Sequence, residues 1–164
     1  MKNITTVEKR SERELVVTRT FNGPARIVFK AWTTPELFMR WWAPKSMGMV
    51  LRSCEMDVRV GGRYRLVFGH DASNPDEFFG RYIEVTPHSR LVWTNEEGGE
   101  HGSVTTVTFE EKGGKTLLVI NDSYPSKEAL DEAIASGSTA GGMSETLDQL
   151  DEFVRTSVAG IGRS

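Results

Sequence analysis

The amino-acid sequence predicts an α+β fold, a curved seven-stranded antiparallel sheet with two short helices and a long C-terminal helix. Three observations support this: an opening strand followed by two proline-initiated helices, a run of six closely spaced strand-like segments, and a long amphipathic stretch near the C-terminus. Strands joined by hairpin-length loops form antiparallel meanders. Such a sheet must cover its apolar face, and the last helix is the one long amphipathic element available for this.

The opening strand is expected at residues 15–21, where β-branched residues dominate. Asn22-Gly23-Pro24 ends it, and Pro24 suits the first turn of a helix. Thr34-Pro35 repeats this device, with Thr34 as the N-cap of a second short helix that Pro44 ends. Both helices are expected to pack on one end of the sheet, with Trp32 and at least one of Trp41 and Trp42 buried.

The six strand-like segments that follow are separated by turn-forming residues. Gly61-Gly62 lies between two of them, and glycine adopts positive φ without steric penalty, so we expect a tight turn there. Gly113-Gly114 also lies between two strands, which favours a hairpin turn over a phosphate-binding loop, because such a loop leads into a helix. The predicted strands are residues 48–60, 62–69, 78–86, 90–96, 103–111 and 115–122.

Helical periodicity returns after residue 125. Ser126 stands ahead of Glu128 and Ala129 as a capping hydroxyl would, and a longer helix is expected from 139 to 156. One apolar stripe runs along this longer helix and provides the face that covers the sheet. The stripe consists of Met143, Leu147, Leu150 and Val154.

Composition and charge exclude several classes of function. The chain of 164 residues has a net charge of −3 and no basic stretch of the kind that binds nucleic acid or a membrane surface. Its one cysteine cannot form an internal disulfide, and no apolar run is long enough for a membrane span or a signal core. We therefore expect a cytoplasmic protein with a flexible polar tail at residues 1–13 and a single domain at residues 14–158.

Histidines and the cysteine are present without the spacing that metal or nucleophilic sites require. His70, His88 and His101 each lie in or beside a predicted loop, and none belongs to a metal-ligand motif. Cys54 lies in the middle of a predicted strand, where a buried inert thiol is the usual case. We therefore expect neither a metal nor a cofactor, and the sequence identifies no catalytic residue.

Asp57 and Arg59 stand two residues apart on a predicted strand, so their side chains share one face. A carboxylate and a guanidinium in this arrangement can orient a polar ligand group inside a pocket. The alternative is a structural pair beside the Gly61-Gly62 turn, and we favour that interpretation.

Three segments resemble, in this order, one known family: Phe21 to Trp32, Trp41-Trp42-Ala43-Pro44, and Asp57 to Tyr64. The family is that of homologues of the activator of the heat-shock-protein-90 ATPase, within the START-like (SRPBCC, Bet v 1-like) superfamily. The resemblance extends from about Leu15 to Val154 and implies the helix-grip architecture, a START-like domain built around a cavity. The chain departs from the family at Gly142-Met143, where many relatives have Gly-Trp, and the smaller Met side chain should widen the pocket mouth.

The helix-grip architecture implies a ligand cavity between the sheet and the C-terminal helix. Aromatic and apolar residues of the predicted strands and of the last helix supply its walls, since such pockets are mostly apolar with few polar anchors. The alternative is that these residues form an ordinary core, and the sequence leaves this open. The expected lining is Trp42, Tyr64, Leu66, Phe68, Trp93, Val107, Met143 and Leu147.

The resemblance implies a cytoplasmic protein that binds a small, largely hydrophobic molecule, with neither nucleic acid nor membrane as a partner. Homodimer formation stays open. Two alternatives of other classes also stay open: an enzyme similar to the polyketide cyclases and aromatases of the superfamily, or a protein that interacts with a chaperone ATPase. For the enzyme, the acid or base inside the pocket would come from Tyr64, Tyr82, Asp57, Arg59 or Glu84.

Overall fold

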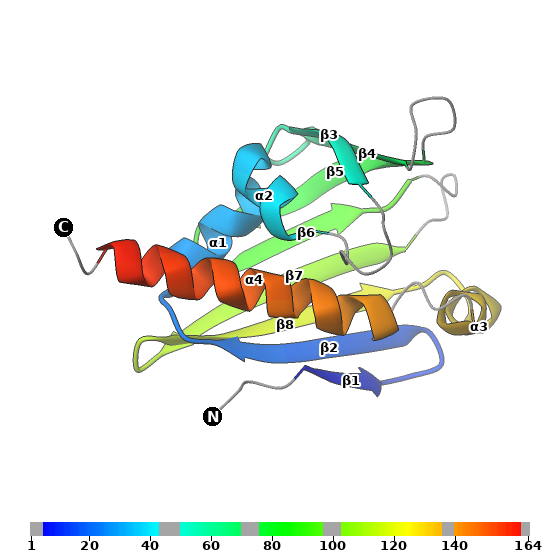
Figure 1. Ribbon diagram of the computed structural model, residues 1–164. Coiled ribbons are helices and arrows are strands. Elements are labelled where there is room, and N and C mark those ends of the chain that lie inside the picture. The colour runs from blue at the N-terminus through cyan, green and yellow to red at the C-terminus, as the bar shows by residue number, and fades with distance from the viewer. Residues whose placement is uncertain (1–4, 43–49, 70–75, 97–102, 136–139, 162–164) are drawn as a thin grey trace.

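The structure is a computed structural model that describes residues 5–42, 50–69, 76–96, 103–135 and 140–161 (Figure 1). The described residues form one antiparallel sheet and four helices. The strands are β1 (Thr6–Lys9), β2 (Glu14–Phe21), β3 (Val50–Met56), β4 (Arg63–Gly69), β5 (Asp76–Thr86), β6 (Arg90–Thr94), β7 (Val104–Lys112) and β8 (Lys115–Ser123). The helices are α1 (Ala25–Thr33), α2 (Pro35–Trp41), α3 (Lys127–Ala135) and α4 (Ala140–Ile161).

The strands follow the order β1-β2-β8-β7-β6-β5-β4-β3, and every neighbouring pair is antiparallel. The sheet therefore has eight strands, and the prediction of seven was wrong by one. The additional strand is β1, which lies within the segment assigned to the tail. All four of its residues are exposed, so it carries no apolar alternation, and its backbone pairing with β2 alone makes it a strand.

The two short helices form where the sequence predicts them. Pro24 is the N-cap of α1 rather than its first residue, and Thr34 is the N-cap of α2 with Pro35 directly after it. Neither N-cap side chain caps its helix, because proline has no donor or acceptor to offer and the Thr34 hydroxyl makes no capping hydrogen bond. Ser126 does act as predicted, since its hydroxyl accepts a hydrogen bond of 3.1 Å from the Ala129 amide.

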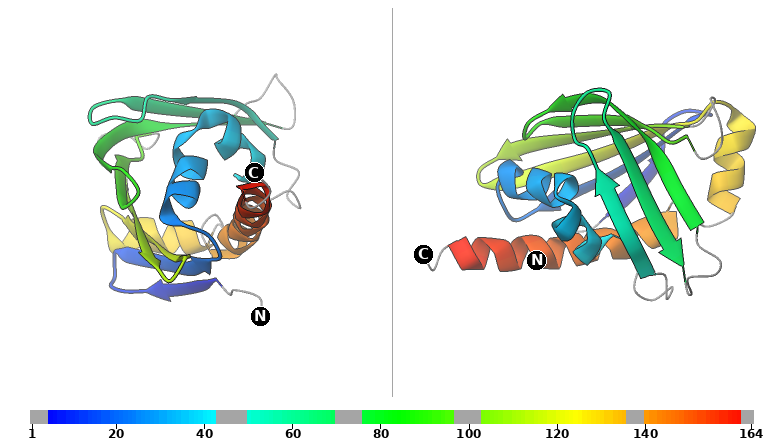
Figure 2. Two further views of the ribbon diagram at one scale, coloured as in Figure 1. Left: turned by 90° about the vertical axis from the view of Figure 1, so that its left-hand side faces the viewer. Right: turned by 90° about the horizontal axis from the view of Figure 1, so that it is seen from above.

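The sheet curls around one face, which we call the inner face, and α1, α2 and α4 lie against it (Figure 2). Helix α4 runs in front of the sheet, whereas α3 lies apart at one end (Figure 1). The Gln149 side chain of α4 donates a hydrogen bond of 2.9 Å to the Trp41 carbonyl, which joins α4 to α2. Trp32 and Trp41 are buried and Trp42 is half-buried, as expected from the helical spacing. Among the residues that the structure describes, no helix is both long and apolar enough to cross a membrane.

The Gly61-Gly62 turn joins β3 to β4, as the sequence predicts. Gly61 has a φ of +84°, a conformation that residues with a side chain rarely adopt. Gly62 is required for a different reason: a Cβ atom at this position would lie 2.0 Å from the Asp57 carbonyl oxygen. Gly61 thus permits the tight turn because it can adopt a positive φ. Gly62 permits it because the Asp57 carbonyl oxygen can approach a residue without a Cβ atom.

Candidate functional site

The inner face of strands β4 to β7 carries the predicted pocket residues of the sheet. Tyr64 and Leu66 alternate on β4 and are both buried; Val107 on β7 is fully buried, and Trp93 on β6 is half-buried. Gly80 of β5 lies opposite Tyr64, and a Cβ atom at Gly80 would lie 2.9 Å from the Tyr64 ring and 1.8 Å from the Thr94 carbonyl oxygen. Only glycine therefore leaves room for the Tyr64 ring on this part of the inner face.

Trp32 of α1 is the centre of an aromatic cluster that joins the short helices to the sheet. Its ring centroid lies 4.8 Å from that of Trp41, 5.9 Å from that of Trp42 and 5.9 Å from that of Trp93. Trp42, which follows α2, also stacks on Phe38 at 4.8 Å. Two predicted pocket residues, Trp42 and Trp93, thus meet through Trp32, although they are far apart in the sequence.

The indole N–H of Trp32 is a buried donor for which the described residues supply no acceptor. The side chain is only 2% exposed, and no hydrogen-bond partner for Nε1 is found among the residues that the structure describes. Trp41 differs, because its Nε1 donates a hydrogen bond of 3.0 Å to the Ala31 carbonyl. Since an unsatisfied buried N–H costs about 1–3 kcal/mol, the Trp32 donor is a point where an acceptor would be favourable.

Tyr64, Tyr82 and Trp93 form a second group of rings on the inner face. Their centroids lie 5.9 Å apart for Tyr64 and Tyr82, and 6.4 Å apart for Tyr82 and Trp93. Burial, with a smaller contribution from Cys54, raises the pKa of the Tyr82 phenol well above its usual value. Burial also raises the pKa of the Cys54 thiol to about 11, with Glu36 and Glu55 adding to the effect. Both groups therefore stay neutral at physiological pH.

A chain of polar side chains crosses the inner face beside these rings. The Tyr64 hydroxyl lies 3.0 Å from Asn95 Oδ1, and it lies 2.8 Å from the Thr94 carbonyl oxygen. Asn95 Nδ2 donates to Thr105 Oγ1 at 3.0 Å, and Thr105 Oγ1 donates to Asp122 Oδ1 at 2.5 Å. The Asn95–Thr105–Asp122 part of the chain, which we call the Asp122 chain, therefore donates in one direction and ends on a carboxylate.

Asp122 has an environment that disfavours its charge. It lies on β8 with Thr105 and Leu15 as its cross-strand neighbours, and it forms no ion pair with any described residue. Burial raises the pKa of the Asp122 carboxyl, and the hydrogen bond from Thr105 opposes this rise without cancelling it. Burial and the nearby Asp122 also raise the pKa of the Tyr124 phenol to about 12.

The structure describes the side chains of six of the eight residues that the sequence predicts as the cavity lining. Trp42, Tyr64, Leu66, Trp93, Val107 and Leu147 all belong to one hydrophobic cluster, with Trp42 and Trp93 at its partly buried margin. The Phe68 backbone lies in β4 and pairs with Leu51, and Met143 lies within α4, but the side chains of both are outside the described residues. The structure thus brings six of the eight together, while their role in ligand binding stays a prediction.

The other chemically interesting residues lie away from the inner face. Arg59 Nε is 2.9 Å from Asp57 Oδ2, and both side chains are exposed at the Gly61-Gly62 turn, so the structural interpretation is confirmed. Glu84 forms an exposed ion pair of 3.2 Å with Arg90. His88 lies in the β5–β6 turn, whereas His70 and His101 are outside the described residues. Within the described ranges, no three potential metal-ligating side chains come together.

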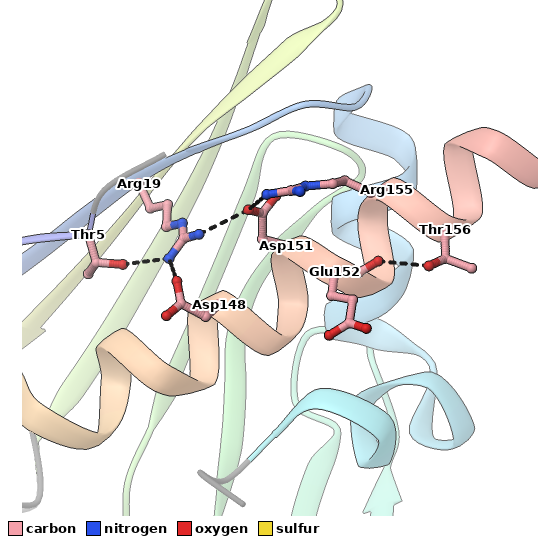
Figure 3. Close-up of polar contacts among 7 residues, drawn as sticks. All are labelled: Thr5, Arg19, Asp148, Asp151, Glu152, Arg155 and Thr156. Atoms are coloured by element: carbon pink, nitrogen blue, oxygen red, sulfur yellow. Dashed lines mark hydrogen bonds and ion pairs between the residues drawn. The ribbon is translucent and has the colours of Figure 1, made fainter. Parts of the chain in front are cut away.

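A buried ionic network fastens α4 to the sheet (Figure 3). Arg19 projects from the inner face of β2, where only 1% of its side chain is exposed, and it donates to Asp151 Oδ2 at 3.0 Å and to Asp148. Asp151 also accepts from Arg155 at 2.8 Å, and Thr5 Oγ1 accepts from Arg19 at 3.0 Å. This network holds the middle of α4 in one position over the sheet.

Sequence reasoning missed the Asp122 chain and the Arg19 network. The strand that contains Thr105 alternates only weakly between polar and apolar residues, because Thr105 and Thr106 are adjacent, so its sequence does not reveal which face turns inward. Asp122 and Arg19 occupy inner positions two residues from buried Ile120 and Val17, respectively. Because alternate residues of a strand share a face, the positions of these two apolar residues were the one sequence signal that Asp122 and Arg19 face inward.

The family model of Activator of Hsp90 ATPase homolog 1-like proteins matches residues 22–155. The chain belongs to this family. The match includes α1, α2, the strands from β3 to β8 and most of α4, so the aromatic cluster and the Asp122 chain both lie within it. No curated protein sequence matches the chain.

Solved structures show the same fold at low sequence identity. A protein of Rhodobacter sphaeroides has a TM-score of 0.82 at 24% identity, over 93% of this chain and 98% of that one. A protein of Nitrosomonas europaea has a TM-score of 0.80 at 23% identity, over 92% and 99%. An AHSA1-like protein of Aeromonas hydrophila has a TM-score of 0.64 at 21% identity, over 87% and 93%. The fold of this chain is therefore shared by solved proteins of low sequence identity.

Proposed function

We propose that the protein is a cytoplasmic binding protein for a small, largely apolar molecule, held between the inner face of the sheet and α4. The ligand would contact the aromatic cluster around Trp32 with its apolar body and the Asp122 chain with one polar group. The lining predicted from the sequence is retained in this proposal, including Phe68 and Met143. No cofactor is needed for such a role.

The observation that carries this proposal is the incomplete burial of side chains that point inward. Trp42, Trp93, Cys54 and Met56 all pack against the hydrophobic cluster, yet each keeps some exposed surface. The remaining exposed surface of these side chains at the margin of the cluster is apolar surface that a small ligand could cover. The unpartnered N–H of Trp32 in the same cluster also favours an occupant with an acceptor atom.

The direction of the hydrogen bonds in the Asp122 chain supports a ligand whose polar group is a hydrogen-bond donor. Asn95 and Thr105 both donate toward Asp122, so the chain ends in an acceptor with a second carboxylate oxygen. A hydroxyl on the ligand can donate to this oxygen, and its own oxygen can accept from an N–H. An aromatic alcohol therefore combines the features that the site favours.

The test uses 1-naphthol as the probe and two readouts. The melting temperature should rise with probe concentration through the linkage of binding to folding. Alkylation of Cys54 by iodoacetamide should slow in parallel, because Cys54 is half-buried at the margin of the same cluster. Leu147→Trp should weaken both effects by filling the space, whereas Ile83→Trp, at a position that is 49% exposed, adds the same ring outside the interior and should leave both unchanged.

Two results would contradict the proposal. In the first, 1-naphthol changes neither the melting temperature nor the Cys54 alkylation rate at any soluble concentration. In the second, Leu147→Trp and Ile83→Trp respond equally to the probe, which would place the bound probe on the surface. The alkylation readout uses the wild-type chain and therefore remains decisive if Leu147→Trp fails to fold.

The Asp122 chain supports one alternative, an enzyme of the cyclase type that removes a proton next to a carbonyl group. Asp122 would accept the proton from the carbon, leaving an enolate whose oxygen faces a donor such as the Trp32 N–H. A direct test is exchange of the central methylene protons of naphthoylacetone with deuterated water, followed by proton NMR. Acceleration that Asp122→Asn abolishes would support the enzyme, and exchange at the buffer rate would reject it.

A further inference from the structure

A groove of about 810 Å³ lies where α1, α2, the β5–β6 turn and the C-terminal part of α4 meet. None of the inner-face residues of the proposed ligand site whose side chains the structure describes lines it. Arg26 and Lys30 of α1, Arg40 of α2 and His88 of the turn contribute cationic or titratable side chains to its wall. The groove is therefore a second concave surface, separate from the interior of the helix grip.

The charges of the groove are not balanced within the described protein. The chain has more Asp and Glu (23) than Lys and Arg (20), yet no carboxylate of the described residues lines this groove. Glu36 and Glu152 directly precede the lining residues Leu37 and Phe153 in the chain, but neither is part of the lining. No described acidic residue forms an ion pair with Arg26, Lys30 or Arg40, whereas Arg59, Arg65, Arg81 and Arg90 each have one.

The rest of the groove is mainly apolar. Leu37 of α2 and Phe153 of α4 are half-buried and line it, and Phe29 of α1 adds a buried ring to the lining. His88 packs edge-on against Phe29 with ring centroids 5.6 Å apart, and its φ of +65° is an unusual conformation for a residue with a side chain. The turn thus fixes an imidazole at the edge of an apolar surface.

We propose that this groove binds an amphiphilic anion, a molecule with an apolar chain and one carboxylate head. The chain would lie over Leu37 and Phe153, and the head would be held by Lys30, Arg40 and Arg26. A volume of about 810 Å³ is within the range of roughly 300–1,000 Å³ that small-molecule sites occupy. Cations that lack an internal partner attract an anion without first breaking an ion pair.

The experiment measures binding of dodecanoate by isothermal titration calorimetry, with dodecanol and dodecyltrimethylammonium as probes of the same chain length. Dodecanoate should bind one per protein, and its affinity should fall as salt is added. The double variant K30E/R40E should weaken dodecanoate binding by at least about tenfold, since two attractions become repulsions. R52E makes the same kind of charge change at an exposed arginine of β3 and should leave binding unchanged.

Further readouts separate this groove from the interior site and from a membrane surface. Dodecanoate bound in the groove should leave Cys54 alkylation unchanged, whereas 1-naphthol in the interior slows it. The groove proposal is wrong if dodecanol binds as tightly as dodecanoate, if K30E/R40E binds dodecanoate like the wild type, or if dodecanoate protects Cys54. It is equally wrong if the protein binds only anionic phosphatidylglycerol vesicles and not monomeric dodecanoate.

Discussion

Arg19 of β2 and Asp151 of α4 form an ion pair of 3.0 Å in which 1% and 2% of the side chains are exposed. The two residues lie 132 positions apart in the chain, so this contact connects its beginning to its last helix. Arg155 also binds Asp151, and this second cation helps to satisfy the buried carboxylate (Figure 3).

Removing one partner of this pair should destabilise the protein strongly. Asp151→Ala leaves a buried guanidinium without its main counter-ion, and we expect a loss of about 3–5 kcal/mol in the free energy of unfolding. Replacing both partners, as Arg19→Met with Asp151→Leu, should recover most of this loss because no charge remains buried. Urea unfolding measures both effects. Glu77→Ala, which breaks an exposed pair with Arg65, is the control and should change stability by less than about 1 kcal/mol.

The two glycines of the β3–β4 turn should respond differently to alanine. Gly61→Ala forces a side chain into a positive φ with open space around it, for which we expect a loss of about 1 kcal/mol. Gly62→Ala places a methyl group 2.0 Å from the Asp57 carbonyl oxygen, so the turn must move and the loss should reach about 3 kcal/mol. Equal losses in thermal or urea unfolding would contradict this assignment.

The stability of the protein should depend on the ionisation of Asp122. Because burial raises the pKa of this carboxyl in the folded state, its contribution to stability is complete below its usual pKa and is lost as pH rises through the raised value. Asp122→Asn cannot ionise, and its Oδ1 can still accept from Thr105. The stability of the variant relative to the wild type should therefore increase from pH 3.5 to pH 8. A constant difference between the two unfolding curves would show that Asp122 titrates normally.

Cys54 should react slowly for a partly exposed thiol. Its pKa is raised to about 11, so the thiolate fraction at pH 8 is about a thousandth, and the rate should rise about tenfold per pH unit up to that pKa. Iodoacetamide labelling followed by mass spectrometry measures this rate. Labelling in 8 M urea should be much faster at pH 8, and a native rate that levels off below pH 9 would refute the raised pKa.

Local sequence patterns determined the type and order of most elements. Prolines and turn glycines mark where helices begin and strands reverse, and the stripe of Leu147, Leu150 and Val154 marks the buried face of α4. These features depend on contacts between residues close in the chain, so the sequence reveals them directly. The predicted burial of Trp32 and of at least one of Trp41 and Trp42 follows from the same spacing and is confirmed, since Trp32 and Trp41 are buried.

Only the tertiary structure decided which polar residues face inward. Asp122 meets Thr105 across neighbouring strands, and Arg19 meets Asp151 across two layers of the fold. Such contacts depend on strand register and on helix position, and shifting a strand by one residue would turn every side chain to the other face. The same reason applies to β1, whose exposed residues form a strand only because β2 offers an unpaired edge. The sequence thus determines the framework of this protein, and the three-dimensional packing determines the chemistry of its interior.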